Sequence, residues 1–464
     1  MGNFEKRYGL MTATCMVVGT VIGSGVFFKA QNVLQATGGN MPLGIIAWVI
    51  TGILMIFCSL QFASMAARYE DTSEGVVGYA DKTCGKTYGY LFAWFLTNIY
   101  YPAMTSVLAW VSARYFGELF GWSPVSAEVL ALSGFFLIAV YALNAFSPRL
   151  AGKFQVSATV IKLIPILLMA IIGTIVGFAK GTLTENFTNI VEAVPGGNAS
   201  GLFAAVVATV FAYEGWIVAT SINAELKNPK KTLPLALIIG SLVVVAAYVF
   251  YYIGVAGGAT NAVLMEKGAT VAFSNIFGKV GGALLNICVV VSCLGTLNGL
   301  MVASTRGMYS IASRDEGPSP KVFSQIDGAT NMVNNSSIWG LFVCAAWLLF
   351  FYGANLADGG WFGLFNFDSS EIPIVTIYAM YVPMFIVWMV KEKDLGVYKR
   401  FILPTISIVS CLFMVFCAVY AHGIRPFLNA KEAGGSFTFP VLFYLVIFVV
   451  IMGAGLLLRK SRKK

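Results

Sequence analysis

Two segments with glycines or a carboxylate interrupt otherwise apolar stretches of this chain. The first reads Gly-Thr-Val-Ile-Gly-Ser-Gly-Val-Phe over 19–27, and the second reads Phe-Ala-Tyr-Glu-Gly-Trp over 211–216. Three glycines within seven residues disfavour a continuous helix, because each costs about 1 kcal/mol relative to alanine. A carboxylate such as Glu214 inside an apolar stretch is costly unless it faces a cavity or a partner. We therefore predict that each segment breaks a helix.

A broken helix offers backbone groups that bind charge. Around 24–26, the first amides of a new helix lack partners within that helix and carry about half a positive charge, which suits a carboxylate. Carbonyls released near Val21, Phe211 and Glu214 can accept hydrogen bonds from an ammonium group. A site that favours an anion beside a cation fits an α-amino acid.

The predicted binding residues come from both breaks. We expect a side chain placed at Gly25 to fill the space of the ligand's carboxylate. Each segment also has a structural alternative, because glycines serve close helix packing and a membrane glutamate can pair with a neighbouring helix. The complete predicted set is Val21, Ile22, Gly23, Ser24, Gly25, Phe211, Ala212, Tyr213 and Glu214.

The elements that must position these residues are membrane helices. The chain has 464 residues, of which 58% are hydrophobic and 11% charged, whereas soluble domains carry about 25% charged residues. Stretches of about 20 apolar residues predict spans. We predict an all-α integral membrane protein with twelve spans at 10–37, 42–67, 88–117, 126–146, 155–178, 200–223, 233–256, 280–305, 336–353, 371–390, 401–421 and 438–458.

The two breaks fall in spans 1 and 6, which are five spans apart. Because five is odd, spans 1–5 and 6–10 form two halves of inverted topology, and matching interruptions in such halves indicate a binding site near the midplane. We predict a first repeat over 1–180 with its break near 22–25, a second over 181–392 with its break near 212–215, and two further spans over 393–464.

The basic residues predict the orientation. With the N-terminus inside, 22 of the 30 lysines and arginines fall on inner segments and 6 on outer ones, so both termini are predicted to be cytoplasmic. The net charge of +9 then faces the anionic inner leaflet of the bilayer rather than a nucleic acid.

The sequence shows no recognisable pattern for binding a metal or a cofactor. The eight cysteines show no CxxC or zinc spacing, and only one histidine is present, so we expect no metal, no cofactor and no enzymatic activity. Connections between spans are short and leave no room for a soluble catalytic domain.

The motifs over 19–27 and 211–216, with Glu-Leu-Lys-Asn-Pro over 225–229, resemble signatures of the amino acid/polyamine/organocation (APC) superfamily. Within it they resemble the L-type amino-acid transporters and their bacterial serine/threonine-exchanger relatives, over roughly 5–460. The resemblance implies a LeuT-type fold of 5 + 5 inverted repeats plus two C-terminal helices. It also implies sodium-independent exchange of L-amino acids, small neutral ones such as Ala, Ser, Thr and Cys, by alternating access in the plasma membrane.

The resemblance also implies roles for individual residues. Val21, Ser24 and Gly25 hold the backbone of the amino acid, and Phe211 is the gate over it. Lys162 replaces a bound sodium ion and contacts Gly19 and Ser292. The alternative for Lys162 is a lysine that lies along the inner vestibule.

Other interpretations remain open at this point. A proton-coupled symporter in which Lys162 or Glu214 titrates is one, and a channel or receptor-like membrane protein is another. The loop over 116–122 lacks the cysteine that bonds L-type transporters to a heavy subunit, so we expect no such partner and a monomer. We expect Lys29 to face the outer vestibule, and Tyr248 to lie either near the pathway or in an aromatic belt.

Overall fold

Helices account for the architecture, as expected where lipid cannot satisfy free backbone groups. The computed structural model describes residues 9–69, 75–216, 226–328, 332–434 and 438–459, and every element of regular structure in these ranges is helical. The basic termini at 1–8 and 460–464 lie outside the described residues, as does Glu225 of the 225–229 motif.

The helices have the following bounds: α1 (Leu10–Val21), α2 (Gly25–Ala36), α3 (Met41–Arg68), α4 (Val76–Cys84), α5 (Lys86–Phe95), η1 (Leu96–Tyr100), α6 (Tyr101–Glu118), α7 (Ala127–Phe146), α8 (Pro148–Ile161), α9 (Leu163–Leu168), η2 (Met169–Gly173), α10 (Thr174–Lys180), α11 (Thr182–Thr188), α12 (Gly197–Tyr213), α14 (Pro229–Ala256), α15 (Asn261–Lys267), α16 (Ala269–Ala312), α17 (Pro320–Phe323), α18 (Asn334–Asn355), η4 (Gly363–Phe365), α19 (Ile372–Lys391), η5 (Tyr398–Ile402), α20 (Leu403–Val419), η6 (Tyr420–Ile424), α21 (Arg425–Glu432) and α22 (Pro440–Leu458).

Most predicted spans are confirmed as helices able to cross a membrane. Among the described residues, nine helical stretches are long and apolar enough, and the bent pair α1 and α2 makes a tenth. The nine are Met41–Arg68, Ala127–Phe146, Arg149–Lys180, Lys230–Ala256, Ala269–Ala312, Asn334–Asn355, Ile372–Lys391, Tyr398–Glu432 and Pro440–Leu458. The chain is therefore a multi-span helical membrane protein.

The two other predicted spans are also helical where they are described. Helices α5, η1 and α6 follow one another over 86–118, and α12 covers the first part of the span predicted at 200–223. Residues 217–223 of that span lie outside the described residues. The complete twelve-span arrangement with inverted repeats stays a prediction.

The chain divides into two compact units. Unit 1 comprises Met1–Gly89, Ile166–Gly278 and Val375–Ala421, and unit 2 comprises Tyr90–Pro165, Lys279–Ile374 and His422–Lys464. Each unit thus takes helices from both predicted repeats. The repeat boundaries at 180 and 392 stay predictions.

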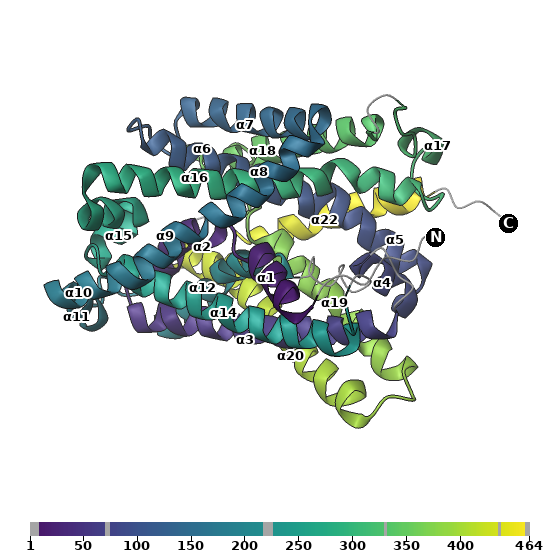
Figure 1. Ribbon diagram of the computed structural model, residues 1–464, viewed down its shortest axis with the longest axis horizontal. Coiled ribbons are helices and arrows are strands. Elements are labelled where there is room, and N and C mark those ends of the chain that lie inside the picture. The colour runs from purple at the N-terminus through teal and green to yellow at the C-terminus, as the bar shows by residue number, and fades with distance from the viewer. Residues whose placement is uncertain (1–8, 70–74, 217–225, 329–331, 435–437, 460–464) are drawn as a thin grey trace. The chain divides into compact units, whose positions relative to one another are not determined.

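Unit 1 contains both interrupted segments. Helix α2 packs along α12, α1 packs along α14, and α3 packs against both α12 and α14 (Figure 1). The hydroxyls of Thr51 and Thr209 lie 2.7 Å apart across the α3–α12 contact. The Tyr213 hydroxyl donates to the Trp48 carbonyl at 2.9 Å in the same contact. These bonds fix the end of α12, where its helix breaks.

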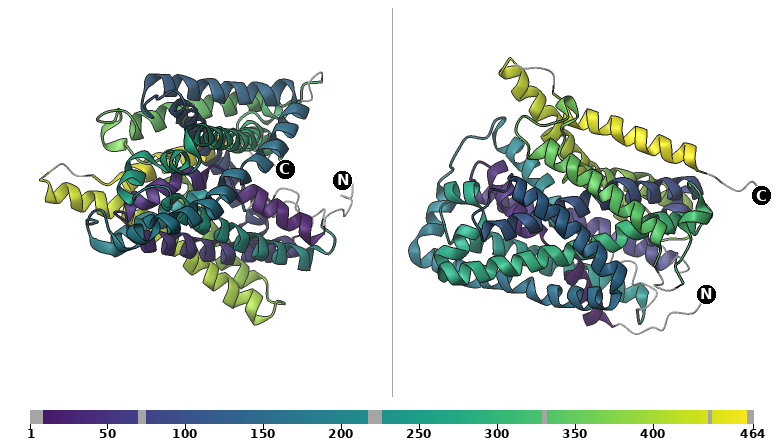
Figure 2. Two further views of the ribbon diagram at one scale, coloured as in Figure 1. Left: turned by 60° about the vertical axis from the view of Figure 1, so that its left-hand side comes forward. Right: turned by 90° about the horizontal axis from the view of Figure 1, so that it is seen from above.

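Unit 2 is built on helices α6, α7 and α18, each of which packs on the other two (Figures 1 and 2). The part of α16 beyond Gly278 joins them, since the Asn286 amide donates to the Tyr115 carbonyl at 2.8 Å. At Gly278 the backbone φ is 74°, which separates this part of α16 from its first turns. Unit 2 holds Lys162 and Ser292 of the predicted site.

Candidate functional site

The structure shows the interruption within span 1, and it shows a helix end at the segment predicted to interrupt span 6. Helix α1 ends at Val21 and α2 begins at Gly25 with its axis bent by 54°. Helix α12 ends at Tyr213, after which Glu214 is extended, with φ −62° and ψ 154°. Gly215 follows with φ +110°, a conformation that L side chains rarely adopt. A glycine is therefore needed where α12 stops.

The two breaks lie against each other within unit 1. A Cβ built on Gly25 would lie 2.5 Å from the Cα of Ala212, and a Cβ built on Gly215 would lie 2.6 Å from the carbonyl oxygen of Thr20. Each glycine thus allows one broken helix to touch the backbone of the other. The predicted residues 21–25 and 211–214 are brought together at this double contact.

This contact corrects the expectation that a side chain at Gly25 would fill the space of the ligand's carboxylate. The space beside its Cα holds the backbone of α12 rather than open volume. A larger residue at Gly25 would first push α12 away, because close-packed interiors resist added volume. The close-packing alternative therefore describes Gly25 itself. A role for its amide in binding is compatible with this packing and stays a prediction.

Ser24 carries a polar group without a partner at the break. It is the N-cap residue of α2, is 1% exposed, and makes no side-chain cap hydrogen bond. Its Oγ has no hydrogen-bond partner among the described residues, although buried hydroxyls ordinarily have one. The Ser24 carbonyl accepts from the Phe27 amide at 3.1 Å. Ser24 thus places an unsatisfied hydroxyl beside the first amides of α2, which have no partner within that helix.

Tyr248 of α14 joins the two breaks, a contact that the sequence did not predict. Its hydroxyl lies 3.0 Å from the carbonyl oxygen of Val21 and 2.9 Å from that of Ala212. The side chain is fully buried, so its placement in an aromatic belt is wrong. The only sequence signal was a tyrosine inside an apolar span. Since a carbonyl oxygen has two lone pairs, Val21 can still accept a second donor, such as an ammonium group.

Buried aromatic rings support Tyr248 from behind. Trp48 packs edge-on against Tyr213 and Tyr248, with ring centroids 5.8 and 5.4 Å apart. The rings of Tyr213 and Tyr248 are themselves 5.2 Å apart. Such pairs add about 0.5–1.5 kcal/mol each beyond their buried area. The Tyr248 hydroxyl is therefore held in a defined position toward both breaks.

Glu214 and Phe211 flank the contact on α12. Phe211 is 8% exposed, and its ring packs edge-on against Phe28 at 5.0 Å. Glu214 interacts electrostatically with Tyr378 of α19. The Tyr378 hydroxyl also accepts a 3.4 Å hydrogen bond from the indole of Trp216. An ionisable carboxyl group thus stands at the midpoint of the broken segment.

Two other predicted residues of the break are also buried. Ile22 is 1% exposed and its amide donates to the Val18 carbonyl at 2.9 Å, while Gly23 lies between the two half-helices. Lys29 was expected in the outer vestibule, but its side chain is 0% exposed. The expectation for Lys29 is therefore wrong.

Lys162 lies where α8 ends and α9 begins in unit 2, with 5% of its surface exposed. A Cβ on Gly295 would meet the Ala158 Cβ at 2.5 Å, and Asn298 donates to Gln155 at 2.9 Å. Helices α8 and α16 are therefore antiparallel here.

Continued by one turn, this register puts Lys162 at the level of Ser292. The Ser292 Oγ is buried without a hydrogen-bond partner among the described residues. Gly19 belongs to α1 in unit 1. The sodium-replacing role of Lys162, with Gly19 and Ser292, stays a prediction.

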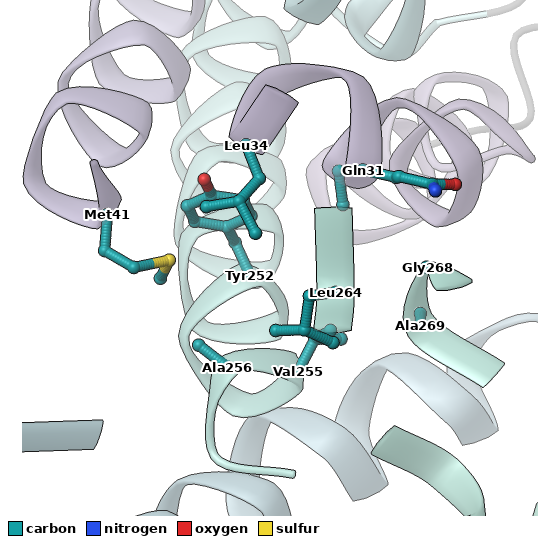
Figure 3. A pocket seen from close by; sticks show the side chains of 10 residues that line it. Gln31, Leu34, Met41, Tyr252, Val255, Ala256, Leu264, Gly268 and Ala269 are labelled. Carbon is teal, nitrogen blue, oxygen red and sulfur yellow. The ribbon is translucent and has the colours of Figure 1, made fainter. Parts of the chain in front are cut away.

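A separate small cavity lies between α2, α14 and α15. Its lining includes Leu34, Met41, Tyr252 and Leu264 (Figure 3), and its volume of about 10 Å³ is about that needed for one water molecule. Gln31 closes one side by donating to the Met265 carbonyl at 3.0 Å. This cavity is too small and too apolar for an amino acid, and the contact between the breaks is the candidate site.

The chain matches a family model described as amino acid permease over residues 8–460. A multi-span helical protein with two broken helices in contact is consistent with a membrane transporter. Because the match covers nearly the whole sequence, the chain belongs to the amino acid permease family, and it is a membrane transporter of amino acids rather than an enzyme.

Similar curated proteins are also amino-acid transporters. The serine/threonine exchanger of Bacillus subtilis (strain 168) is 29% identical over 405 residues, which are 86% of each chain. The b(0,+)-type amino acid transporter 1 of Mus musculus is 28% identical over 90% of this chain and 84% of its own. The cystine/glutamate transporter of Homo sapiens is 29% identical over 69% of this chain and 64% of its own. The resemblance to the APC superfamily and to bacterial serine/threonine exchangers is confirmed.

Proposed function

We propose that the chain is a sodium-independent exchanger of small neutral L-amino acids that works by alternating access in the plasma membrane. The observation that carries the proposal is the contact between the two helix breaks, with the unsatisfied Ser24 hydroxyl beside the start of α2. A helix N-terminus binds a carboxylate, and released carbonyls bind an ammonium group.

The proposed substrate class rests on the site and on one relative. The Bacillus subtilis relative is named for the exchange of serine and threonine. Buried aromatic side chains such as Phe211 and Phe28 stand close to the break, and such a lining favours an uncharged side chain. Serine, threonine, alanine and cysteine are accordingly the proposed substrates.

The proposed architecture has twelve spans, with both termini in the cytoplasm and 5 + 5 inverted repeats. The distribution of basic residues supports this orientation. Interrupted helices at matching places in spans 1 and 6 support the repeats. We propose that the chain works as a monomer without a disulfide-linked partner, since the 116–122 loop contains no cysteine.

A counterflow experiment tests the proposed reaction. Purified protein in proteoliposomes should take up labelled L-serine only when the vesicles contain an unlabelled amino acid, because an exchanger returns to its starting state only when loaded. Replacing sodium by choline on both sides should leave the initial rate unchanged within about twofold. Uptake into empty vesicles driven by a pH gradient would show a proton-coupled symporter instead, and a tenfold sodium dependence would contradict sodium independence.

Lys162 supplies a prediction about the two faces of the transporter. If its ammonium links α8 to α16 and to span 1, Lys162→Ala removes a charge-assisted link and loosens the inner half of span 1. We expect the apparent affinity for L-serine on the cytoplasmic side to fall about tenfold, which corresponds to about 1.4 kcal/mol, with the outer side changed less.

Titrating L-serine on each face of oriented vesicles distinguishes the two interpretations of Lys162, a replacement for a sodium ion or a lysine of the inner vestibule. Lys153→Ala is the matched control, because Lys153 lies on the same helix with an exposed side chain. A Lys162→Ala protein that exchanges like the wild type from both faces would mean that Lys162 is a vestibule lysine.

A further inference from the structure

A fully buried lysine stands one turn beyond the break of span 1. Lys29 is 0% exposed and lies in α2, five residues after Ser24, which is about 7.5 Å along a helix. An ammonium group inside a membrane protein needs compensating interactions. The groups around the Lys29 ammonium must therefore compensate its charge.

Aromatic faces supply part of that compensation. The Lys29 Nζ lies 5.2 Å from the ring centroid of Phe28 and 5.3 Å from that of Phe211. Both distances are within the range of a cation–π interaction, which is strongest where water is excluded. The two rings also meet edge-on with centroids 5.0 Å apart. One charge thus joins a ring of α2 to a ring of α12.

The backbones of α2 and α12 also meet near these side chains. Gly25, one turn before Lys29, contacts Ala212, the residue that follows Phe211. The ring of Phe211 therefore cannot leave its position without giving up contacts with both Phe28 and Lys29. We call the side chains of Phe28, Lys29 and Phe211 the latch, because the Lys29 ammonium holds together one ring from each of two helices. The backbones of the same two helices touch at Gly25 and Ala212.

We propose that Lys29 is a positioning residue that holds Phe211 closed over the bound amino acid. This inference rests on the proposed function, in which Phe211 is the gate of an amino-acid site. Weakening the attraction between the Lys29 ammonium and the Phe211 ring should open the gate more often. Substrate should then dissociate faster toward the outer side of the membrane, where α2 lies in the proposed orientation.

The burial of Lys29 favours this role over direct recognition of a substrate side chain. A lysine that recognised an acidic side chain would need to present its ammonium to the binding space. Lys29 is fully buried, and its ammonium lies against the two rings. A change that affects acidic substrates alone would show recognition instead.

Fluorinated phenylalanine at position 211 tests the latch with little change in ring shape. Fluorine withdraws charge from the ring face and so weakens a cation–π interaction. In proteoliposomes, we expect 4-fluoro-, difluoro- and trifluorophenylalanine to raise the KM for external L-serine progressively, to about tenfold, with kcat within twofold of the wild type. The same series at Phe27 is the matched control, since that buried ring of α2 packs edge-on against Tyr251 at 5.5 Å.

Variants of Lys29 complete the test. Lys29→Arg keeps the charge and should stay within twofold of the wild type, whereas Lys29→Met should raise KM about tenfold. Adding trifluorophenylalanine at 211 to Lys29→Met should cause no further rise, because the interaction is already absent. The fluorine series in the Lys29 protein remains decisive if Lys29→Met does not fold.

Four results would overturn the latch. One is an unchanged KM across the fluorine series, and a second is a graded rise that persists in Lys29→Met. A third is an effect seen with L-glutamate but not with L-serine, which would make Lys29 a specificity residue. The fourth is a wild-type protein that exchanges no amino acid, which would overturn the proposed function as well. If the wild type exchanges normally and KM does not change across the fluorine series, only the latch is overturned.

Discussion

Gly215→Ala is expected to reduce amino-acid exchange by about two orders of magnitude. Its φ of +110° is strained for any residue with a Cβ, at about 1–3 kcal/mol. The added Cβ would also lie 2.6 Å from the Thr20 carbonyl oxygen, and such overpacking costs about 1–3 kcal/mol more. Both costs fall on the contact between the two breaks, so the site should lose its geometry. Initial rates of L-serine counterflow, with thermal stability measured in detergent, check this prediction.

A second glycine provides the control for Gly215→Ala. Gly134 lies within α7, and a Cβ built on it would meet nothing within 4 Å. Gly134→Ala should therefore keep the exchange rate and stabilise α7 slightly, because alanine favours a helix over glycine by about 1 kcal/mol. If Gly215→Ala exchanged as fast as Gly134→Ala, the break in α12 would not require its left-handed backbone.

Tyr248→Phe is expected to raise the KM for L-serine by between about ten- and one hundredfold. The change removes only the hydroxyl that lies 3.0 Å from the Val21 carbonyl oxygen and 2.9 Å from that of Ala212. A buried polar group left unsatisfied costs about 1–3 kcal/mol, which spans that range at about 1.4 kcal/mol per tenfold. The two carbonyls belong to the two interrupted segments, Val21 to the first and Ala212 to the second. Losing their common donor should therefore loosen the position of one break relative to the other.

Tyr90→Phe separates this effect from a general loss of stability. The Tyr90 hydroxyl is also buried and donates to a single carbonyl, that of Gly455, at 2.7 Å within unit 2. Its removal should lower the thermal midpoint while KM stays within twofold. KM and thermal midpoint measured for both variants give the answer. Equal KM changes in the two proteins would argue against a specific role for Tyr248.

Gly25 shows how packing and binding share the same residues. Sequence reasoning offered close packing and substrate binding as alternatives, and the structure shows that packing against Ala212 is real. The neighbouring Ser24 hydroxyl is left without a partner at the same place. A variant at Gly25 therefore reports on helix contact as well as on binding, whereas Tyr248→Phe changes one hydrogen-bonding group and adds no volume.

The amino-acid sequence alone was enough to predict the membrane class, most of the spans and the interruptions at 19–27 and 211–216. These features depend on local properties: a run of about 20 apolar residues is enough to predict a span, and glycines or a carboxylate within it are enough to predict an interruption. The bend of 54° between α1 and α2 and the extended Glu214 lie where the residues 19–27 and 211–216 indicated. The short motifs also identified the family.

Which groups meet at the interrupted segments depends on helix packing and could not be predicted from the sequence. Tyr248 reaches a carbonyl 227 positions earlier in the chain, and Lys29 lies beside the ring of Phe211 rather than in a vestibule. Neither relation leaves a local signal, because a tyrosine or lysine in an apolar span has the same sequence pattern whatever helix it faces. The partner depends on how α1, α2, α12 and α14 pack, and that packing follows from side chains distributed over the whole of unit 1.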